Sequence, residues 1–419
     1  MDERLLQYIW KTKLFDPKGL KAITGEDVRI VHGGNYNVNA GPDFLDARIY
    51  INEKLWAGHV ELHVKNSDWL LHKHDADAAY ENVILHVVWQ FDKPAPLAFP
   101  VLELQNHIPN LLLGKYKDLM NAFKFIPCEN LISLTDELVL KSWKERMLVE
   151  RLTHKAFAFA QYNLESRNNW EETFWWMIAS NFGMPVNKDA FEKIARSIPV
   201  SILAKCKSQL IQLEALLLGQ AGLLTDVGDD AYPNLLKREY LFLQNKYSLK
   251  PAHTTVQFLR MRPANFPSIR LVQLAALIHR SSHLFSTIID TNKNADLLQL
   301  LDVTANDYWH YHYHFHDSSA YRIKKLGTDM KQNILINTFY PAMFAYGTAH
   351  NNDLLKSRAI AGLEELPAEK NKIINNFNKL GVPCNNAGDS QALIHLYKNY
   401  CIEKRCLDCA IGNNLLKKA

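Results

Sequence analysis

The sequence predicts two differently built parts, an N-terminal α/β domain and a mainly α-helical region that follows it. Over the first ~125 residues, short runs rich in β-branched and aromatic residues are separated by turn-forming dipeptides such as Gly33-Gly34. From about residue 133 onward, apolar residues recur at helical spacing instead. Four of the six cysteines fall between Cys384 and Cys409, which sets the C-terminal segment apart.

Length and composition agree with this division. The chain has 419 residues, more than a usual single hydrophobic core contains. Hydrophobic residues make up 47% and charged residues 22%, which argues against a mainly disordered chain. The formal net charge of +4 is compatible with a nucleic-acid partner without pointing to one.

The N-terminal sequence and the cysteine content predict a cytoplasmic protein. The opening residues MDERLLQYIW are partly acidic and contain no long apolar run, so a secretory signal is not expected. No stretch reaches the roughly 18 consecutive apolar residues that a membrane helix needs, so no membrane partner is expected. Six cysteines in a chain of this length do not form a disulfide scaffold.

The N-terminal domain is predicted over residues 1–126 as a helix followed by a mixed sheet. Leu5, Leu6 and Ile9 fall on one face of a helix at 2–15. Strands are expected at 28–32, 44–51, 56–64, 83–89 and 98–104, with a short helix at 75–82.

The region 127–380 is predicted to be an α-helical domain, and 381–419 a cysteine-rich metal-binding segment. The helices are expected at 136–162, 170–182, 188–196, 207–218, 233–245, 268–290, 331–345 and 353–380.

The residues that carry chemistry surround two neighbouring strands of the predicted sheet. Asp43 opens the strand 44–51, and the next strand carries His59, Glu61 and His63. Because alternate side chains of a strand share a face, the latter three are expected to point the same way. A hairpin between the two strands would bring Asp43 near Glu61, and paired carboxylates bind a hard cation such as Mg²⁺ or Mn²⁺. Such a cation polarises a phosphodiester and activates water.

This arrangement resembles the signature of the PD-(D/E)XK, or restriction-endonuclease-like, superfamily. In that signature an Asp after Pro opens one strand, and Glu-x-Lys lies on the next. By position, Asp43 and Glu61 match the metal-binding carboxylates, and His63 stands where the catalytic Lys is expected. His63 could be cationic or a metal ligand, and Lys65 could instead take the place of the catalytic Lys. The resemblance covers roughly residues 1–105 and implies a metal-dependent nuclease with a restriction-endonuclease-like mixed sheet.

A second resemblance extends over nearly the whole chain. The segments GPDF, GHVELHVKNSDW, RPANFPSIRLVQLA and YCIEKRCLDCAIGN are similar to a bacterial family of unknown function, family 2851. This resemblance implies that the segments belong together in one protein, and it supplies no activity.

Histidines are concentrated beside the candidate site. His72 and His74 follow it, and with His59, His63 and His86 they make five of the 17 histidines in the chain. An imidazole-rich site suits Zn²⁺ or Mn²⁺, and His72 and His74 are also candidates to contact a substrate phosphate. A hydrogen-bonded histidine network without a metal is the alternative.

Two further groups are candidate binding residues. Arg262 and Arg270 flank a proline-containing loop and are candidates to hold phosphate, with inter-helix salt bridges as the alternative. Four cysteines spaced C-x16-C-x4-C-x2-C are predicted to bind Zn²⁺ or an iron–sulfur cluster, with His395 as a possible replacement for the first and free buried thiols as the alternative. They are Cys384, Cys401, Cys406 and Cys409.

The sequence therefore favours a metal-dependent nuclease acting on DNA or RNA. A non-catalytic nucleic-acid- or protein-binding module on a degenerate nuclease scaffold is the first alternative, because His63 replaces the expected Lys. A Zn- or Mn-dependent hydrolase of a small molecule, using the histidines, is the second.

Overall fold

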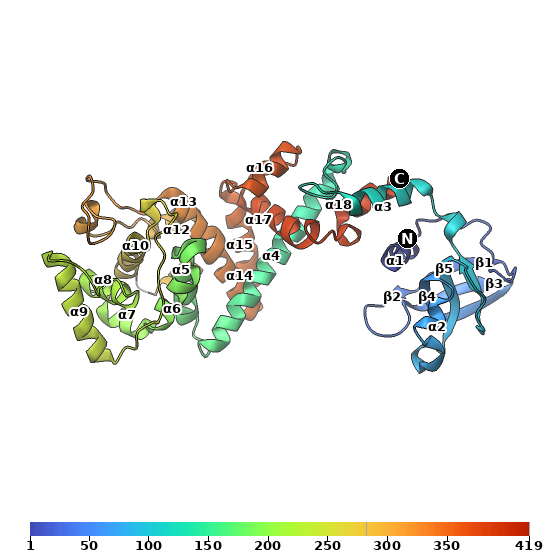
Figure 1. The fold of residues 1–419 in the computed structure, drawn as a ribbon, viewed down its shortest axis with the longest axis horizontal. Coiled ribbons are helices and arrows are strands. Elements are labelled where there is room, and N and C mark those ends of the chain that lie inside the picture. The colour runs from blue at the N-terminus through green and yellow to red at the C-terminus, as the bar shows by residue number, and fades with distance from the viewer. Residues whose placement is uncertain (282, 419) are drawn as a thin grey trace. The chain divides into compact units, whose positions relative to one another are not determined.

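The computed structural model describes residues 1–281 and 283–418, and the chain folds into two compact units. The first unit comprises Met1–Trp143, Lys379–Val382 and Leu396–Ala419, and the second comprises Lys144–Asn378 and Pro383–His395. The C-terminal residues thus pack with the N-terminal part of the chain, a return that their position in the sequence does not reveal. Figure 1 shows the helices and strands with their labels.

A six-stranded mixed sheet forms the centre of the first unit. The strand order is β1-β3-β4-β5-β6, with β2 paired to β3. β1, β3 and β4 pair antiparallel, whereas β5 and β6 continue the sheet in parallel. The strands are β1 Val28–His32, β2 Asn35–Tyr36, β3 Phe44–Ile51, β4 Lys54–Lys65, β5 Val83–Gln90 and β6 Val101–Glu103.

Helix α1 contacts β4 through the apolar face that the sequence predicts. Leu5, Leu6 and Ile9 are buried, and the carboxylate of Asp2 caps the helix by accepting a hydrogen bond from the Leu5 N–H. The helices of this unit are α1 Glu3–Thr12, α2 Asp68–Leu71, α3 Asn110–Asn121 and α18 Ala410–Lys417.

The connection between β4 and β5 differs from the predicted helix at 75–82. It consists of the single-turn α2 and two 3-10 turns, His74–Ala76 and Ala78–Tyr80. Asp77 separates the two turns in an extended conformation, and its side chain accepts a hydrogen bond from the Ala79 N–H. An Asp side chain that bonds the nearby backbone competes with helix formation in this way.

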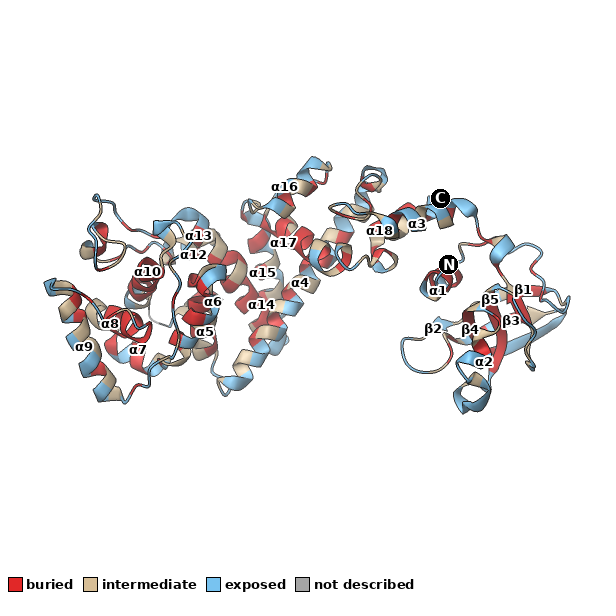
Figure 2. Ribbon diagram, in the orientation of Figure 1, coloured by how far each residue is buried: buried red, intermediate tan, exposed pale blue. Residues whose placement is uncertain are grey.

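The second unit is built from α-helices packed around buried apolar residues, which Figure 2 shows in red. The most buried are α8 and α10, where nearly every residue over 213–220 and 267–277 is inaccessible to solvent. The helices are α4 Glu137–Glu165, which begins in the first unit, α5 Trp170–Phe182, α6 Met184–Arg196, α7 Val200–Cys206, α8 Leu210–Gln220, α9 Ala231–Tyr247, α10 Pro267–Arg280, α11 Leu284–Asp290, α12 Asn294–Leu300, α13 Thr328–Ile334, α14 Tyr340–Ala349, α15 Asp353–Glu365, α16 Lys372–Lys379 and α17 Ala387–Leu396.

Two of the predicted long helices are each divided in the structure. The predicted helix at 353–380 is split into α15 and α16, because Pro367 cannot continue a helix and restricts the residue before it. The predicted helix at 268–290 is split into α10 and α11. Among the described residues, no helix combines the length and apolar character that a membrane span requires.

Candidate metal centre in the N-terminal sheet

Asp43 and Glu61 lie next to each other at the junction of β3 and β4. The strands pair with Phe44 opposite Val60. The backbone N–H of Asp43 donates to Glu61 Oε2 at 2.9 Å, and the N–H of Leu62 donates to Asp43 Oδ2 at 3.1 Å. The structure therefore brings together the two carboxylates that the sequence singles out.

Gln7 of α1 orients the carboxylate of Asp43 from the other side. Its Nε2 donates to Asp43 Oδ1 at 2.8 Å, and its Oε1 accepts a hydrogen bond from the Tyr36 hydroxyl at 3.3 Å. Both oxygens of Asp43 thus have a donor. The sequence analysis did not identify Gln7, because no local pattern shows which residue of a helix meets a distant strand.

The electrostatics of the carboxylate pair favour a bound cation. Burial raises the pKa of both Asp43 and Glu61, and the charge of Asp43 raises the pKa of Glu61 further. The hydrogen bonds from Gln7 and Leu62 lower the pKa of Asp43 but do not offset its burial. Glu61 is buried and Asp43 is half-buried. Two such carboxyl groups, which repel each other when ionised, form the kind of site that a divalent cation stabilises.

A chain of hydrogen bonds fixes the tautomer of His63. Asn66 Nδ2 donates to Lys93 O at 2.7 Å, so its Oδ1 is the acceptor for His86 Nδ1 at 3.1 Å. His86 Nε2 is then unprotonated and accepts from His63 Nδ1 at 2.9 Å. The remaining nitrogen of His63, Nε2, is left with a lone pair. Metal-binding histidines are typically held in this way, by a hydrogen bond from the ring nitrogen that does not bind the metal.

His63 is therefore neutral and suited to bind a metal. Its side chain is 1% exposed, and burial, followed by the neighbouring His86, lowers its pKa to about 2. Burial likewise lowers the pKa of His86 to about 3. Of the two roles that the sequence left open for His63, the cationic role of the missing Lys does not fit this environment.

Three histidines surround the carboxylate of Glu61. The ligand nitrogens of His63, His72 and His74 all lie within 4.8 Å of one another. Glu61 Oε1 lies 3.6 Å from His63 Nε2 and 3.5 Å from His74 Nε2. His63 is buried and His72 is exposed, so the group opens to solvent on one side. Three imidazoles and a carboxylate form a donor set suited to Zn²⁺ or Mn²⁺.

The backbone between α2 and the first 3-10 turn places two of these histidines. His72 ends α2, and Lys73 adopts a left-handed conformation with φ of 59°, which reverses the chain before His74. The ring of His74 then stacks on Tyr80 at 3.9 Å between centroids and meets the edge of Trp69 at 5.2 Å.

His59 and Lys65 lie apart from this group. β3 is bulged between Phe44 and Ala47, and His59 Nδ1 accepts a hydrogen bond there from the backbone N–H of Asp46 at 3.3 Å. The extra residue is in β3, so the bulge leaves the alternation of side chains along β4 unchanged, and the face on which His59 lies stays a prediction. Lys65 is exposed near the end of β4.

A cavity of about 790 Å³ opens beside the histidines. His74, Trp69 and Tyr80 contribute to its wall. Its lining carries five carboxylates and one lysine: Glu26, Glu53, Asp75, Asp77, Glu81 and Lys54. This charge balance suits a neutral or cationic small molecule better than a polyanion.

The predicted substrate-binding arginines belong to the second unit. Arg270 is buried, and its guanidinium donates to Gln273 Oε1 at 3.0 Å and to Asn265 Oδ1 at 2.6 Å. Burial lowers its pKa to about 10. Arg262 is exposed ahead of a 3-10 turn. Phosphate binding by these arginines stays a prediction.

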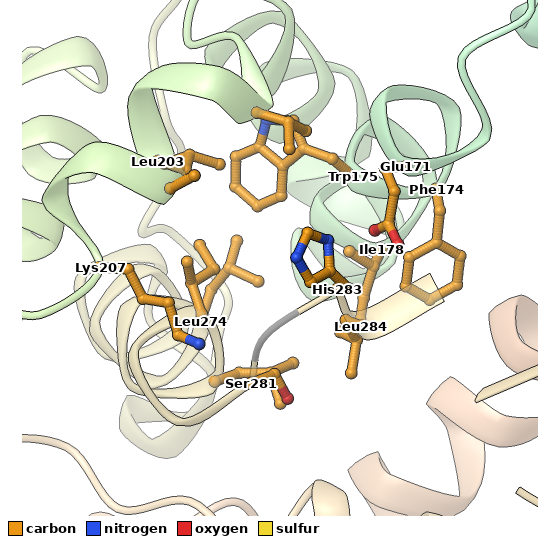
Figure 3. A pocket seen from close by; sticks show the side chains of 14 residues that line it. Glu171, Phe174, Trp175, Ile178, Leu203, Lys207, Leu274, Ser281, His283 and Leu284 are labelled. Atoms are coloured by element: carbon orange, nitrogen blue, oxygen red, sulfur yellow. The ribbon is translucent and has the colours of Figure 1, made fainter. Parts of the chain in front are cut away.

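The second unit also contains an apolar pocket of about 270 Å³ between α5, α7, α10 and the start of α11. Figure 3 shows Trp175 and Leu203 in its wall and the polar side chains of Glu171, Lys207 and His283 around it. Glu171 is engaged at the start of α11, where its carboxylate accepts the N–H groups of residues 285 and 286 at 3.3 and 3.2 Å. The pocket gathers no group of metal ligands or paired catalytic residues.

The four predicted metal-binding cysteines are divided between the two units. Cys401, Cys406 and Cys409 belong to the first unit, and Cys384 belongs to the second, where its Sγ lies 3.4 Å from Ser390 Oγ. The proposed replacement, His395, is also in the second unit, and its Nε2 lies 3.5 Å from a carboxylate oxygen of Glu150. The contact between Cys384 and Ser390 therefore lies within the second unit.

Comparison with known proteins identifies the family without assigning an activity. No curated protein and no solved structure matches the chain. One family model, described as a protein of unknown function, matches residues 3–372. Because this match spans most of the chain, the protein belongs to the DUF2851 family.

Proposed function

We propose that the protein is a metal-dependent nuclease that hydrolyses phosphodiester bonds of DNA or RNA. Mg²⁺ or Mn²⁺ would bind between Asp43 and Glu61. The observation that carries this proposal is the contact of buried Glu61 with half-buried Asp43, in which the Asp43 N–H donates to the Glu61 carboxylate at 2.9 Å. Bringing two carboxyl groups out of water is costly unless a cation neutralises them.

The order of the elements supports the proposal. After α1, the strands β1, β3 and β4 pair antiparallel, and β5 follows the short α2 and pairs parallel to β4. This is the order that resemblance to the PD-(D/E)XK superfamily implies. Asp43 immediately precedes β3, and Glu61 lies within β4, as that resemblance also implies.

Each residue has a distinct role in the proposed reaction. The metal would polarise the scissile phosphate and lower the pKa of a bound water. Gln7 holds the Asp43 carboxylate in place. His63 Nε2 accepts a hydrogen bond from His72 Nδ1 at 3.0 Å and lies 3.6 Å from Glu61 Oε1. The stabilising cation of the superfamily would come from Lys65, since His63 is neutral.

The histidines support a second candidate, a Zn²⁺- or Mn²⁺-dependent hydrolase of a small molecule. The observation favouring it is the convergence of the His63, His72 and His74 ring nitrogens within 4.8 Å beside the acidic cavity. In this case the metal would be bound by the imidazoles and Glu61, and Asp43 would have no direct role in metal binding.

Cleavage assays distinguish the two candidates. Purified protein is incubated with single- and double-stranded DNA and RNA in Mg²⁺, Mn²⁺ or Zn²⁺, beside the variants Asp43→Asn and Glu61→Gln and the control Glu81→Gln on the cavity wall. The nuclease proposal expects cleavage by the wild-type protein and by Glu81→Gln, and a loss of about 100-fold or more in the other two variants.

Two outcomes contradict the nuclease proposal. Hydrolysis of small esters that needs Zn²⁺ or Mn²⁺, depends on His72 and His74 and survives Asp43→Asn would support the second candidate. Nucleic-acid binding without cleavage in any of the metals would support a non-catalytic module instead.

A further inference from the structure

The C-terminal segment returns to the N-terminal unit and is held there by side-chain contacts. Lys418 Nζ lies 2.7 Å from Asp136 Oδ1, and Lys115 Nζ donates to the Lys418 carbonyl at 3.1 Å. The rings of Trp143 and Tyr400 meet edge to face with centroids 5.5 Å apart. Figure 1 shows the resulting neighbourhood of α18 and α3. Residues far apart in the sequence are therefore neighbours here.

Because the C-terminal segment packs with the N-terminal part of the chain, Cys128 lies in the same unit as the three C-terminal cysteines. Cys128 lies in a turn, where its carbonyl accepts the N–H groups of residues 131 and 132, both at 2.9 Å. Cys401 ends a helical turn, and Cys406 and Cys409 flank a short 3-10 turn. All four are free thiols, and all except the partly exposed Cys401 are buried. Nothing local in the sequence marks Cys128 as a partner of the other three cysteines.

The segments that carry the four cysteines pack together. The rings of Phe125 and Tyr397 stack with centroids 4.7 Å apart, and α18 contacts the 3-10 turn Ile132–Leu134 that follows Cys128. In agreement with this packing, burial raises the pKa of Cys401 well above its usual value, and the charges of Cys128, Cys409 and Cys406 raise it further. The charges that act on Cys384 are those of Asp389, Lys144 and Glu369.

Hydrogen-bond donors around Cys409 are arranged for a thiolate. Cys409 precedes α18, and the backbone N–H groups of Gly412 and Ile411 lower the pKa of its thiol against the effect of burial. A neutral thiol is only a weak acceptor, whereas metal-bound sulfurs are commonly stabilised by such donors. Gly412 also permits a close approach, since a Cβ there would lie 2.2 Å from the Cys406 carbonyl oxygen.

The spacing of the sulfurs distinguishes between metals. Among residues 1–281 and 283–418, His63, His72 and His74 form the one group of three or more potential ligands whose atoms all lie within 4.8 Å of one another. No three of the cysteine sulfurs are that close. A tetrahedral Zn²⁺ with bonds of about 2.3 Å needs sulfurs about 3.8 Å apart. An iron–sulfur cluster binds each cysteine through a different iron atom and so accommodates wider spacing.

We infer that Cys128, Cys401, Cys406 and Cys409 bind a four-iron, four-sulfur cluster that fastens the C-terminal segment to the N-terminal unit. Such a site closes a loop of more than 250 residues between Cys128 and Cys401. Binding of the cluster is therefore coupled to folding of the segment, because the ligands meet only when the chain has returned.

Metal analysis of protein purified without oxygen tests the inference directly. We expect iron and acid-labile sulfide in equal amounts, about four of each per chain, with a broad visible absorption that dithionite bleaches. Zinc at one ion per chain, or protein without either metal, would overturn the assignment.

Substitution tests the choice of the fourth ligand. Cys128→Ser should lower the iron content at least about tenfold, whereas Cys384→Ser and the buried control Cys206→Ser should keep it. Iron retained in Cys128→Ser, or lost in Cys384→Ser, would contradict the ligand set.

Thiol labelling of the wild-type protein covers the case in which the Cys128 variant does not fold. Mass spectrometry after maleimide treatment should show Cys128, Cys401, Cys406 and Cys409 protected until the iron is removed by oxidation and chelation, and all four labelled afterwards. Cys384 should label equally before and after. Labelling of Cys128 that does not change on iron removal would contradict its role as a ligand.

Discussion

His63 Nδ1 lies 2.9 Å from His86 Nε2, and this contact decides what His63 can do. Because His86 is fixed in turn by Asn66, the proton of His63 is directed away from Glu61. The lone pair on Nε2 accepts a hydrogen bond from His72 Nδ1 at 3.0 Å, and Nε2 lies 3.6 Å from Glu61 Oε1. His63 is therefore a neutral donor at the position where the nuclease superfamily has a cation.

Replacing His63 by Lys should weaken metal binding and destabilise the protein. The ammonium group would be charged at a site where burial keeps the imidazole of His63 neutral, which we expect to cost about 2–4 kcal/mol of unfolding free energy. The control variant His59→Lys places the same ammonium group outside the group formed by His63, His72 and His74. It should lower the free energy of unfolding by less than about 1 kcal/mol. Urea denaturation and Mn²⁺ titration measure both effects. A His63→Lys protein of wild-type stability with retained activity would show instead that His63 takes the place of the catalytic Lys.

Glu61→Gln should stabilise the metal-free protein. At neutral pH, burial and the charge of Asp43 disfavour ionisation of the wild-type Glu61 carboxyl group. The amide of Gln carries no charge and so avoids this cost, and its oxygen can still accept the hydrogen bond from the Asp43 N–H. We expect a gain of about 1 kcal/mol in unfolding free energy in the presence of EDTA. In excess Mn²⁺ the wild-type protein should instead be more stable than Glu61→Gln, because only the wild-type site binds the ion tightly. Loss of stability in EDTA would show that the carboxylate is favourably paired without metal.

Metal binding should release protons. The pKa values of Asp43 and Glu61 are raised in the folded protein, so the native state holds more protons than the unfolded chain above the ordinary carboxyl pKa. The stability of the metal-free protein should therefore fall as the pH rises from about 4.5 toward the raised pKa values. Mn²⁺ binds the ionised form, so its apparent affinity should rise over the same range.

Calorimetry in two buffers of different ionisation enthalpy measures this proton release. Glu61→Gln serves as the control, because it removes one of the two titrating groups. Binding enthalpies that do not depend on the buffer at pH 7 would exclude a protonated carboxyl group in the free site.

Gln7→Leu should reduce activity more than stability. The side chain of Gln7 orients Asp43 through a 2.8 Å hydrogen bond, and groups that orient metal ligands typically contribute 10- to 100-fold to affinity or rate. We expect a fall of about tenfold in Mn²⁺ affinity, with a change in unfolding free energy below about 1 kcal/mol. Wild-type affinity in this variant would show that the Leu62 N–H alone positions Asp43.

Local patterns in the sequence were sufficient to predict part of this site. Strand alternation and the position of Asp43 ahead of β3 depend on neighbouring residues alone, so the contact between Asp43 and Glu61 could be predicted. The bulge at Asp46 could not be predicted in this way, because it depends on how two strands pair.

The contacts that the sequence analysis missed are those between distant segments. Gln7 reaches Asp43 from α1, and Cys128 meets three cysteines from the other end of the chain. Neither contact has a local pattern, since each depends on the packing of whole elements. The assignment of Cys384 to the second unit has the same cause, because the chain passes from one unit to the other between it and Cys401.

The position of a bound metal tests the central claim most directly. Crystals of the protein soaked in MnCl₂ and measured at the manganese absorption edge would show the ion by its anomalous scattering. We predict a peak bonded to carboxylate oxygens of both Asp43 and Glu61 at about 2.0–2.3 Å. A peak held only by His63, His72 and His74, or none in the first unit, would contradict the account.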